Sequence, residues 1–191
     1  LVSGPENRRY LSGFTASDPG WGMVLITAEA ALLLTDFRYQ EWARQEAQEC
    51  EVCIHQVDLA DTLGVRLKEL QVRRLGFEAA NLTYRQYQRL TQVVADAGLE
   101  VAWRPLEGLV EGLRQIKTGE ELAVMRRALT LTETIMRQVA GELIPGQTER
   151  QVAWEIEKRL REGGAEDVAF PPIVAAGPNS ARPHHHPGDY V

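Results

Sequence analysis

The sequence has few cysteines, no long apolar run and no cluster of basic residues, and each absence argues against a class of protein. Two cysteines among 191 residues are too few for a disulfide-stapled secreted scaffold, so we expect a cytoplasmic location. No stretch approaches the roughly 18 consecutive apolar residues of a membrane-spanning helix. A formal net charge of −6 without a basic run argues against a nucleic-acid partner.

What is present is ordinary for a globular protein. Apolar residues make up 44% of the sequence and charged residues 25%, which is enough to build a buried core. The sequence opens on Leu1-Val2 without an initiator Met, in the pattern of the end of a buried strand. It closes on Asp189-Tyr190-Val191, where apolar patterning resumes. We therefore expect these residues to be a window onto a longer protein.

Strand and helix patterns alternate as far as about residue 104. The third expected helix opens with a capping box formed by Thr83 and Gln86 and stops at Gly98. Such alternation predicts an α/β domain. The expected strands cover 22–28, 30–36, 51–57, 72–78 and 99–103, and the expected helices 38–49, 59–70 and 83–97.

Longer helices follow a boundary near residues 105–118. Capping boxes at Thr118 and Thr148 open two helices, which we expect to end at Pro145-Gly146 and at Gly163-Gly164. Segment 168–176 is expected to be a strand interrupted by prolines. Residues at alternating steps of three and four are expected on one stripe of the first, long helix: Leu122, Met125, Leu129, Thr132, Met136, Val139 and Leu143.

Cys50 and Cys53 form a C-x-x-C pair, a pattern found in redox and zinc sites. A redox pair usually lies at a helix N-terminus, which lowers the thiol pKa, whereas this pair enters a strand. A structural zinc site needs four ligands, and the sequence has no second pair. We expect two partly buried core thiols.

His184, His185 and His186 stand side by side near the end of the sequence. Pro183 and Pro187 bracket them, so they do not look like an appended tag. Adjacent histidines alone are a poor metal-ligand set. From the residue types, a metal site and an exposed loop surface both stay open.

The order of several motifs along the chain indicates a role for the histidine segment. "FPPIVAAGPNSARPHHHP" (170–187) resembles the entry to the catalytic domain of the Xaa-Pro peptidases, the prolidase and aminopeptidase P group of pita-bread metallopeptidases. Ala176 departs from the more frequent Ser of that motif. "LRQIKTGEELAVMRRA" (113–128) and "IPGQTERQVAWEIEKRLREGGAE" (144–166) resemble the start of the same domain. "SGPENRRYLSGF" (3–14) and "LLLTDFRYQEWARQEA" (32–47) resemble the family's creatinase-like N-terminal domain.

The resemblance implies a fold and an activity. It implies a creatinase-like α/β domain with a mixed sheet at 1–112, followed at 113–191 by the first part of an α+β pita-bread catalytic domain. The implied activity is a metal-dependent exopeptidase. It would hydrolyse the Xaa-Pro bond of dipeptides or short peptides with water activated by two divalent ions (Mn, Co or Zn). The family's metal ligands fall beyond residue 191, so we assign none here.

Two other functions stay open. One is a creatinase-type amidinohydrolase, and the other is a metal-free, peptidase-like module for peptide binding or dimerisation. The implied partners are a proline-containing peptide substrate and a second copy of the chain in a homodimer.

The resemblance also implies site residues. His184, the first histidine of P-H-H, would line the substrate pocket and donate a hydrogen bond to the carbonyl oxygen or the tetrahedral intermediate. His185 would bind substrate as well or only orient the loop. In the loop 12–22, Phe14, Asp18 and Trp21 would be exposed, with Trp21 reaching a neighbouring subunit's pocket. The alternative is that Phe14 and Trp21 pack beneath this loop.

Two acidic groups have simpler interpretations. Asp36 with Arg38 has the pattern of a polar pair at a strand end. Glu120 and Glu121 have the pattern of acidic residues at a helix start.

Overall fold

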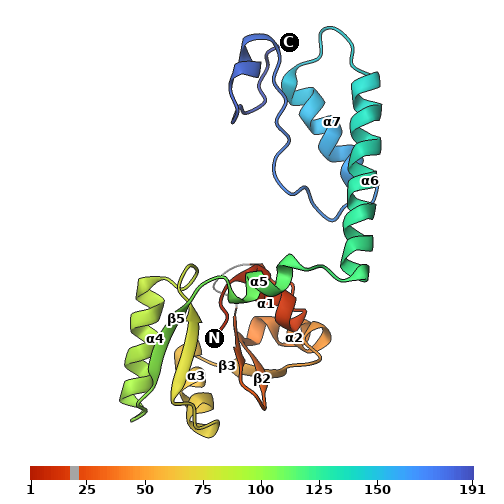
Figure 1. Ribbon diagram of the computed structural model, residues 1–191. Coiled ribbons are helices and arrows are strands. Elements are labelled where there is room, and N and C mark those ends of the chain that lie inside the picture. The colour runs from red at the N-terminus through yellow and green to blue at the C-terminus, as the bar shows by residue number, and fades with distance from the viewer. Residues whose placement is uncertain (18–21) are drawn as a thin grey trace. The chain divides into compact units, whose positions relative to one another are not determined.

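The computed structural model describes residues 1–17 and 22–191, and these form two compact units, Leu1–Ile116 (unit 1) and Lys117–Val191 (unit 2) (Figure 1). Within the described residues, no helix is both long and apolar enough to cross a lipid bilayer.

Unit 1 alternates helices and strands, as the sequence predicts. Thr83 and Gln86 form the expected capping box of the fourth helix, and Gly98 adopts a left-handed conformation (φ 72°) just after its end. The elements are α1 (Pro5–Ser12), β1 (Met23–Ile26), β2 (Ala31–Asp36), the 3-10 turn η1 (Phe37–Tyr39), α2 (Gln40–Glu46), β3 (Glu51–His55), α3 (Leu59–Glu69), β4 (Arg74–Glu78), α4 (Tyr84–Asp96), β5 (Ala102–Leu106) and α5 (Leu109–Gln115).

The strands of unit 1 form two sheets. β1 and β2 make an antiparallel hairpin, and β3 pairs with β2 in parallel, so this three-stranded sheet is mixed, as expected. β4 and β5 pair in parallel in a second sheet. Val2 adds an antiparallel bridge to Val24 at the free edge of β1.

Both faces of the mixed sheet are buried. Successive side chains of a strand point to opposite faces, so Leu32 and Leu34 pack in one cluster with α3 and α4, while Leu33 packs in another with α2. The near-continuous apolar pattern of β2 reflects burial on both sides. The sequence does not predict α1 or α5. α1 lies in the motif at 3–14, and α5 lies in the expected boundary at 105–118.

Unit 2 is built around two helices, α6 (Gly119–Gly141) and α7 (Glu149–Glu162), which pack side by side (Figure 1). Both predicted capping boxes are present, and α7 ends at Gly163 as expected. α6 ends at Gly141, before the predicted Pro145-Gly146. A short 3-10 helix, η2 (Gly177–Ala181), precedes the histidines.

The stripe of α6 that the sequence indicates is mostly exposed and is not the face that packs on α7. The face of α6 that packs on α7 carries Leu131, Ile135 and Val139, and of the predicted stripe only Val139 is buried. Periodicity predicts an apolar face, but it does not say which of two adjacent stripes meets a neighbour. The exposed apolar members are Leu122, Met125, Leu129, Met136 and Leu143.

The expected strand at 168–176 is also wrong. The segment contains no described strand and no strand partner within unit 2. Pro171 and Pro172 lack the amide hydrogens that a sheet ladder needs.

Candidate functional site

A set of polar contacts in unit 2 centres on Glu149, the first residue of α7. Thr148 caps this helix, and the Glu149 side chain contacts the loop of residues 176–188, which contains η2. Glu149 is only 2% exposed. Its Oε1 accepts hydrogen bonds from the Ala176 amide (2.8 Å) and the Asn179 side chain (2.9 Å). Its Oε2 accepts from the Gly188 amide (3.1 Å) and lies 2.6 Å from Nε2 of His185.

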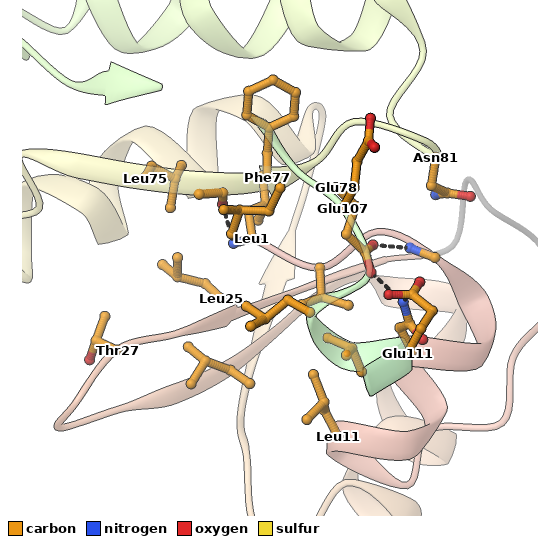
Figure 2. A pocket seen from close by; sticks show the side chains of 18 of the residues that line it. Leu1, Leu11, Leu25, Thr27, Leu75, Phe77, Glu78, Asn81, Glu107 and Glu111 are labelled. Atoms are coloured by element: carbon orange, nitrogen blue, oxygen red, sulfur yellow. Dashed lines mark hydrogen bonds between the residues drawn. The ribbon is translucent and has the colours of Figure 1, made fainter. Parts of the chain in front are cut away.

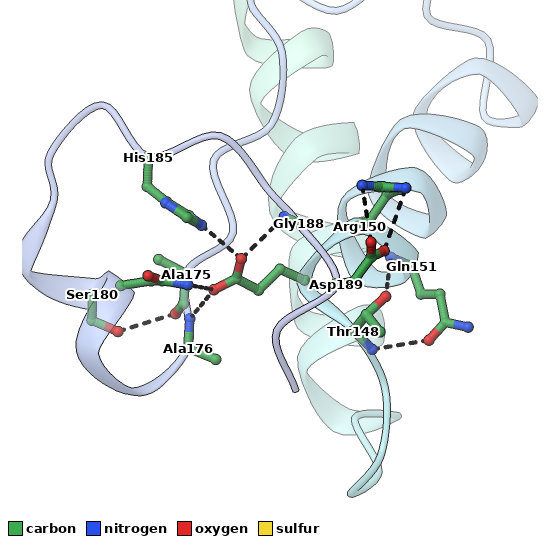
Figure 3. Close-up of polar contacts among 11 residues, drawn as sticks. Thr148, Arg150, Gln151, Ala175, Ala176, Ser180, His185, Gly188 and Asp189 are labelled. Atoms are coloured by element: carbon green, nitrogen blue, oxygen red, sulfur yellow. Dashed lines mark hydrogen bonds and ion pairs between the residues drawn. The ribbon is translucent and has the colours of Figure 1, made fainter.

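The same loop also covers the N-terminus of α7. The Glu149 amide donates to the carbonyl of Tyr190 (3.0 Å), and the Arg150 amide donates to that of Gly188 (3.0 Å). The first amides of a helix have no partner within the helix, so the loop satisfies two of them. The Arg150 guanidinium also pairs with Asp189 at 3.3 Å (Figure 3).

These contacts set the charge of Glu149. Burial alone would raise the pKa of its carboxyl, but hydrogen bonds from the Ala176 amide, His185, Asn179 and the Gly188 amide lower that pKa from its ordinary value of 4.5 to about 2. Glu149 is therefore ionised at neutral pH. A negative charge also suits the positive end of the α7 dipole.

The structure gives the three histidines different surroundings. His185 contacts Glu149 and is half-buried; Figure 3 shows its ring turned toward the carboxylate that also contacts Gly188. His184 and His186 are exposed on either side of it. This geometry suits the interpretation that His185 orients the loop. The contacts of His184 and His185 with substrate stay predictions.

Glu149 is a functional candidate that the sequence reasoning missed. The sequence carries one signal, because Glu149 ends the string "PGQTE", but by itself this string indicates only the start of a helix. Nothing local indicates that this glutamate, unlike Glu120 or Glu121 at the start of α6, is buried by a loop some 30 residues later.

The described residues do not form a metal site. Within residues 1–17 and 22–191, no three His, Cys, Asp or Glu side chains are placed to share a metal ion. Asp189, the acidic residue nearest the histidines in sequence, is engaged by Arg150.

The predicted features of unit 1 have mixed outcomes. Phe14 is wholly buried, with its ring centroid 6.3 Å from that of Tyr39 and 5.8 Å from that of Trp42. Its expected exposure is therefore wrong, and the packing alternative holds for this residue. Asp18 and Trp21 lie outside the described residues.

The remaining polar and thiol predictions are confirmed. Cys50 and Cys53 are free thiols, half-buried and buried, and burial raises the pKa of both. Asp36 accepts the Arg38 amide and pairs with its guanidinium at 2.7 Å. Glu121 completes the capping box of α6.

A groove of about 920 Å³ lies in unit 1 beside the β1 and β4 edges (Figure 2). Its wall includes Leu25 and Leu75, and Glu78 is one of its acidic residues. The Glu78 carboxylate accepts hydrogen bonds of 2.6 Å each from the amides of Ser3 and Gly4 and from Asn7. A carboxylate so engaged holds the start of α1 in place, and we assign it no chemistry.

Two family models and a curated relative match this chain. Residues 1–116 match the creatinase/prolidase N-terminal domain, and residues 123–191 match metallopeptidase family M24. A Bacillus subtilis (strain 168) protein described as an uncharacterized peptidase is 34% identical over 184 residues, covering 96% of this chain and 50% of that protein.

Two solved structures share the fold. A Bacillus anthracis Xaa-Pro dipeptidase has a TM-score of 0.88 at 33% identity, and a Thermotoga maritima X-Pro aminopeptidase has 0.86 at 28%. Each comparison covers 98% of this chain and 51% of the other. The chain thus spans about half the length of these relatives. It belongs to the creatinase/prolidase family of Xaa-Pro peptidases, within the pita-bread metallopeptidases.

Proposed function

We propose that this chain is the N-terminal half of an exopeptidase that hydrolyses the peptide bond before proline in dipeptides or short peptides. The observation that carries the proposal is the loop that contains Pro183, His184 and His185. His185 attaches this loop to Glu149 of α7, while His184 is exposed beside it. The similarity to an Xaa-Pro dipeptidase and an X-Pro aminopeptidase supports the same substrate class.

The proposed role of His184 is to donate a hydrogen bond from an imidazole N–H to the substrate carbonyl oxygen. Negative charge develops on that oxygen when water attacks the carbonyl carbon. A donor already aimed at the oxygen stabilises the transition state more than the ground state, and such donors contribute about 3 kcal/mol to lowering the barrier. His185 is less suited to this role, because its Nε2 already lies against Glu149.

The proposal includes divalent metal ions, because residues 123–191 match a metallopeptidase family. Such ions would supply an activated water at neutral pH. The described residues do not form a site for them, so this half would supply groups on the substrate side of the reaction. A homodimer, a cytoplasmic location and a pocket role for Trp21 stay predictions.

The test uses the full-length protein and compares hydrolysis of Ala-Pro with that of Ala-Ala, with manganese added. We expect preferential cleavage of Ala-Pro. Substitution His184→Ala should lower kcat by about 10²-fold to 10³-fold, as for other oxyanion donors, with the bound metal content unchanged. The control is His186→Ala, an exposed histidine of the same loop, which should keep most of the activity.

Three results would contradict parts of this proposal. Loss of metal in parallel with activity in His184→Ala would show that the assigned role is wrong. Hydrolysis of creatine in place of Ala-Pro would favour the amidinohydrolase alternative. Binding of Ala-Pro without turnover by the metal-supplemented protein would favour a peptide-binding module.

A further inference from the structure

Glu149 is a buried carboxylate for which the proposed chemistry has no use. We propose that it is a positioning residue, which holds the loop of residues 176–188 so that His184 is presented to substrate. The catalytic part of this inference rests on the proposed function, whereas the anchoring of the loop does not.

The contacts of Glu149 span the whole loop. Oε1 takes the donors at its beginning, the Ala176 amide and the Asn179 side chain. Oε2 takes the donors at its end, His185 and the Gly188 amide. One carboxylate therefore fixes both ends of the segment that carries His184. The carbonyls of Gly188 and Tyr190 fasten the end of the same segment to the α7 amides.

Only a carboxylate fits these donors. An ionised carboxylate has two acceptor oxygens, whereas glutamine has one oxygen and an NH₂ group that only donates. In a Glu149→Gln protein, the backbone amide of Ala176 or that of Gly188 would therefore face another donor. Because the side chain is only 2% exposed, water cannot easily replace the lost acceptor, and an unsatisfied buried donor is costly.

The effect on His184 follows from its place in the chain. The ring of its neighbour His185 is held 2.6 Å from Glu149, which restricts the backbone that carries His184. Displacing a catalytic group by about 1 Å can cost about 10²-fold in rate. We therefore expect Glu149 to affect turnover without touching substrate.

The experiment uses the full-length protein and two measurements. Hydrogen–deuterium exchange followed by mass spectrometry reports the opening of 176–188, with α6 as internal reference. Steady-state hydrolysis of Ala-Pro gives kcat and KM. The main variant is Glu149→Gln, and the matched control is Glu120→Gln, which removes a charge from the first turn of α6 at an exposed position.

We expect Glu149→Gln to speed exchange in 176–188 at least tenfold and to lower kcat by about 10²-fold, with KM changed less than about twofold because ground-state binding is kept. Glu120→Gln should match the wild type in both measurements. Asn179→Ala, which removes one of the four donors, should give a smaller change in the same direction. It carries the test if Glu149→Gln does not fold.

The outcomes separate the two proposals. Unchanged exchange in 176–188 overturns the anchoring role, whatever the activity. Faster exchange with unchanged kcat overturns the positioning of His184. If the metal-supplemented wild type does not cleave Ala-Pro, the proposed peptidase function fails and with it the catalytic part of this inference. The exchange data then still decide whether Glu149 anchors the loop.

Discussion

The two units of this chain are stabilised by different means. Among the described residues, twenty apolar side chains are buried in unit 1, and three are buried in unit 2: Ile135, Val139 and Ile156. Unit 1 packs helices on both faces of its mixed sheet. Unit 2 has one small cluster between α6 and α7 and depends on polar contacts at Glu149 to hold its loop.

The comparison shows where each unit can tolerate change. In unit 1 the free energy of folding comes mainly from apolar burial, spread over many side chains. In unit 2 much apolar surface of α6 is exposed, including Met125 (54%) and Leu129 (59%). Its order therefore depends on a few hydrogen bonds, and each of them matters more.

The largest expected effect comes from separating the units. A fragment of residues 1–116 should unfold cooperatively in urea, because it keeps both apolar clusters. A fragment of residues 117–191 should lack such a transition, since a core of three side chains is too small to offset the loss of conformational entropy. Far-UV circular dichroism during the urea titration measures both, with the 191-residue chain as reference. A sharp unfolding transition in fragment 117–191 would show that unit 2, like unit 1, is stable by itself.

A matched pair of leucines tests the comparison at single side chains. Leu33 of β2 is 0% exposed and Leu129 of α6 is 59% exposed. Leu33→Ala should lower the free energy of unfolding by about 3 kcal/mol through lost burial and the cavity left behind. Leu129→Ala should change it by less than about 0.5 kcal/mol, as is usual for exposed sites. Urea unfolding of the 191-residue chain measures both, and equal losses would show that the α6 stripe is buried in solution.

The sequence predicts what is local and misses what depends on distant contacts. The capping boxes at Thr83, Thr118 and Thr148 are all present, because their hydrogen bonds lie within four residues. The sequence does not predict helix α1, because its buried face includes Arg8, whose guanidinium donates to the carbonyls of Gly22 and Ala16. A charged residue at a buried position breaks the apolar periodicity that indicates a helix.

The candidate site divides in the same way. His184 and His185 could be found from the order of the motif around them, whereas the role of Glu149 required the fold. Its partners stand 27 to 39 residues later in the chain, and no local pattern predicts that a helix-start glutamate is the one that the loop buries. Trp21 lies outside the described residues and stays a prediction.

The smallest expected effect is a pH dependence specific to Glu149. The folded-state pKa of about 2 lies below the ordinary 4.5, so the carboxylate stabilises unit 2 fully above about pH 4.5. That contribution is lost as the pH falls through 2. The thermal midpoint of unit 2, followed by the methyl NMR signals of Ile135 and Val139, should be several degrees higher in the wild type than in Glu149→Gln at pH 6. The difference should shrink toward zero near pH 2.

The variant is the necessary reference, because acid also acts on unit 1. Hydrogen bonds from Arg38 and from the Ala60 amide lower the pKa of Asp36 and of Asp58, so unit 1 also loses stability in acid. Taking the difference between wild type and Glu149→Gln cancels those groups, since both proteins contain them. A difference that stays constant from pH 6 to pH 2 would mean that the loop is held by the α7 amides rather than by the ionised carboxylate. Unit 2 would then not depend on the Glu149 charge.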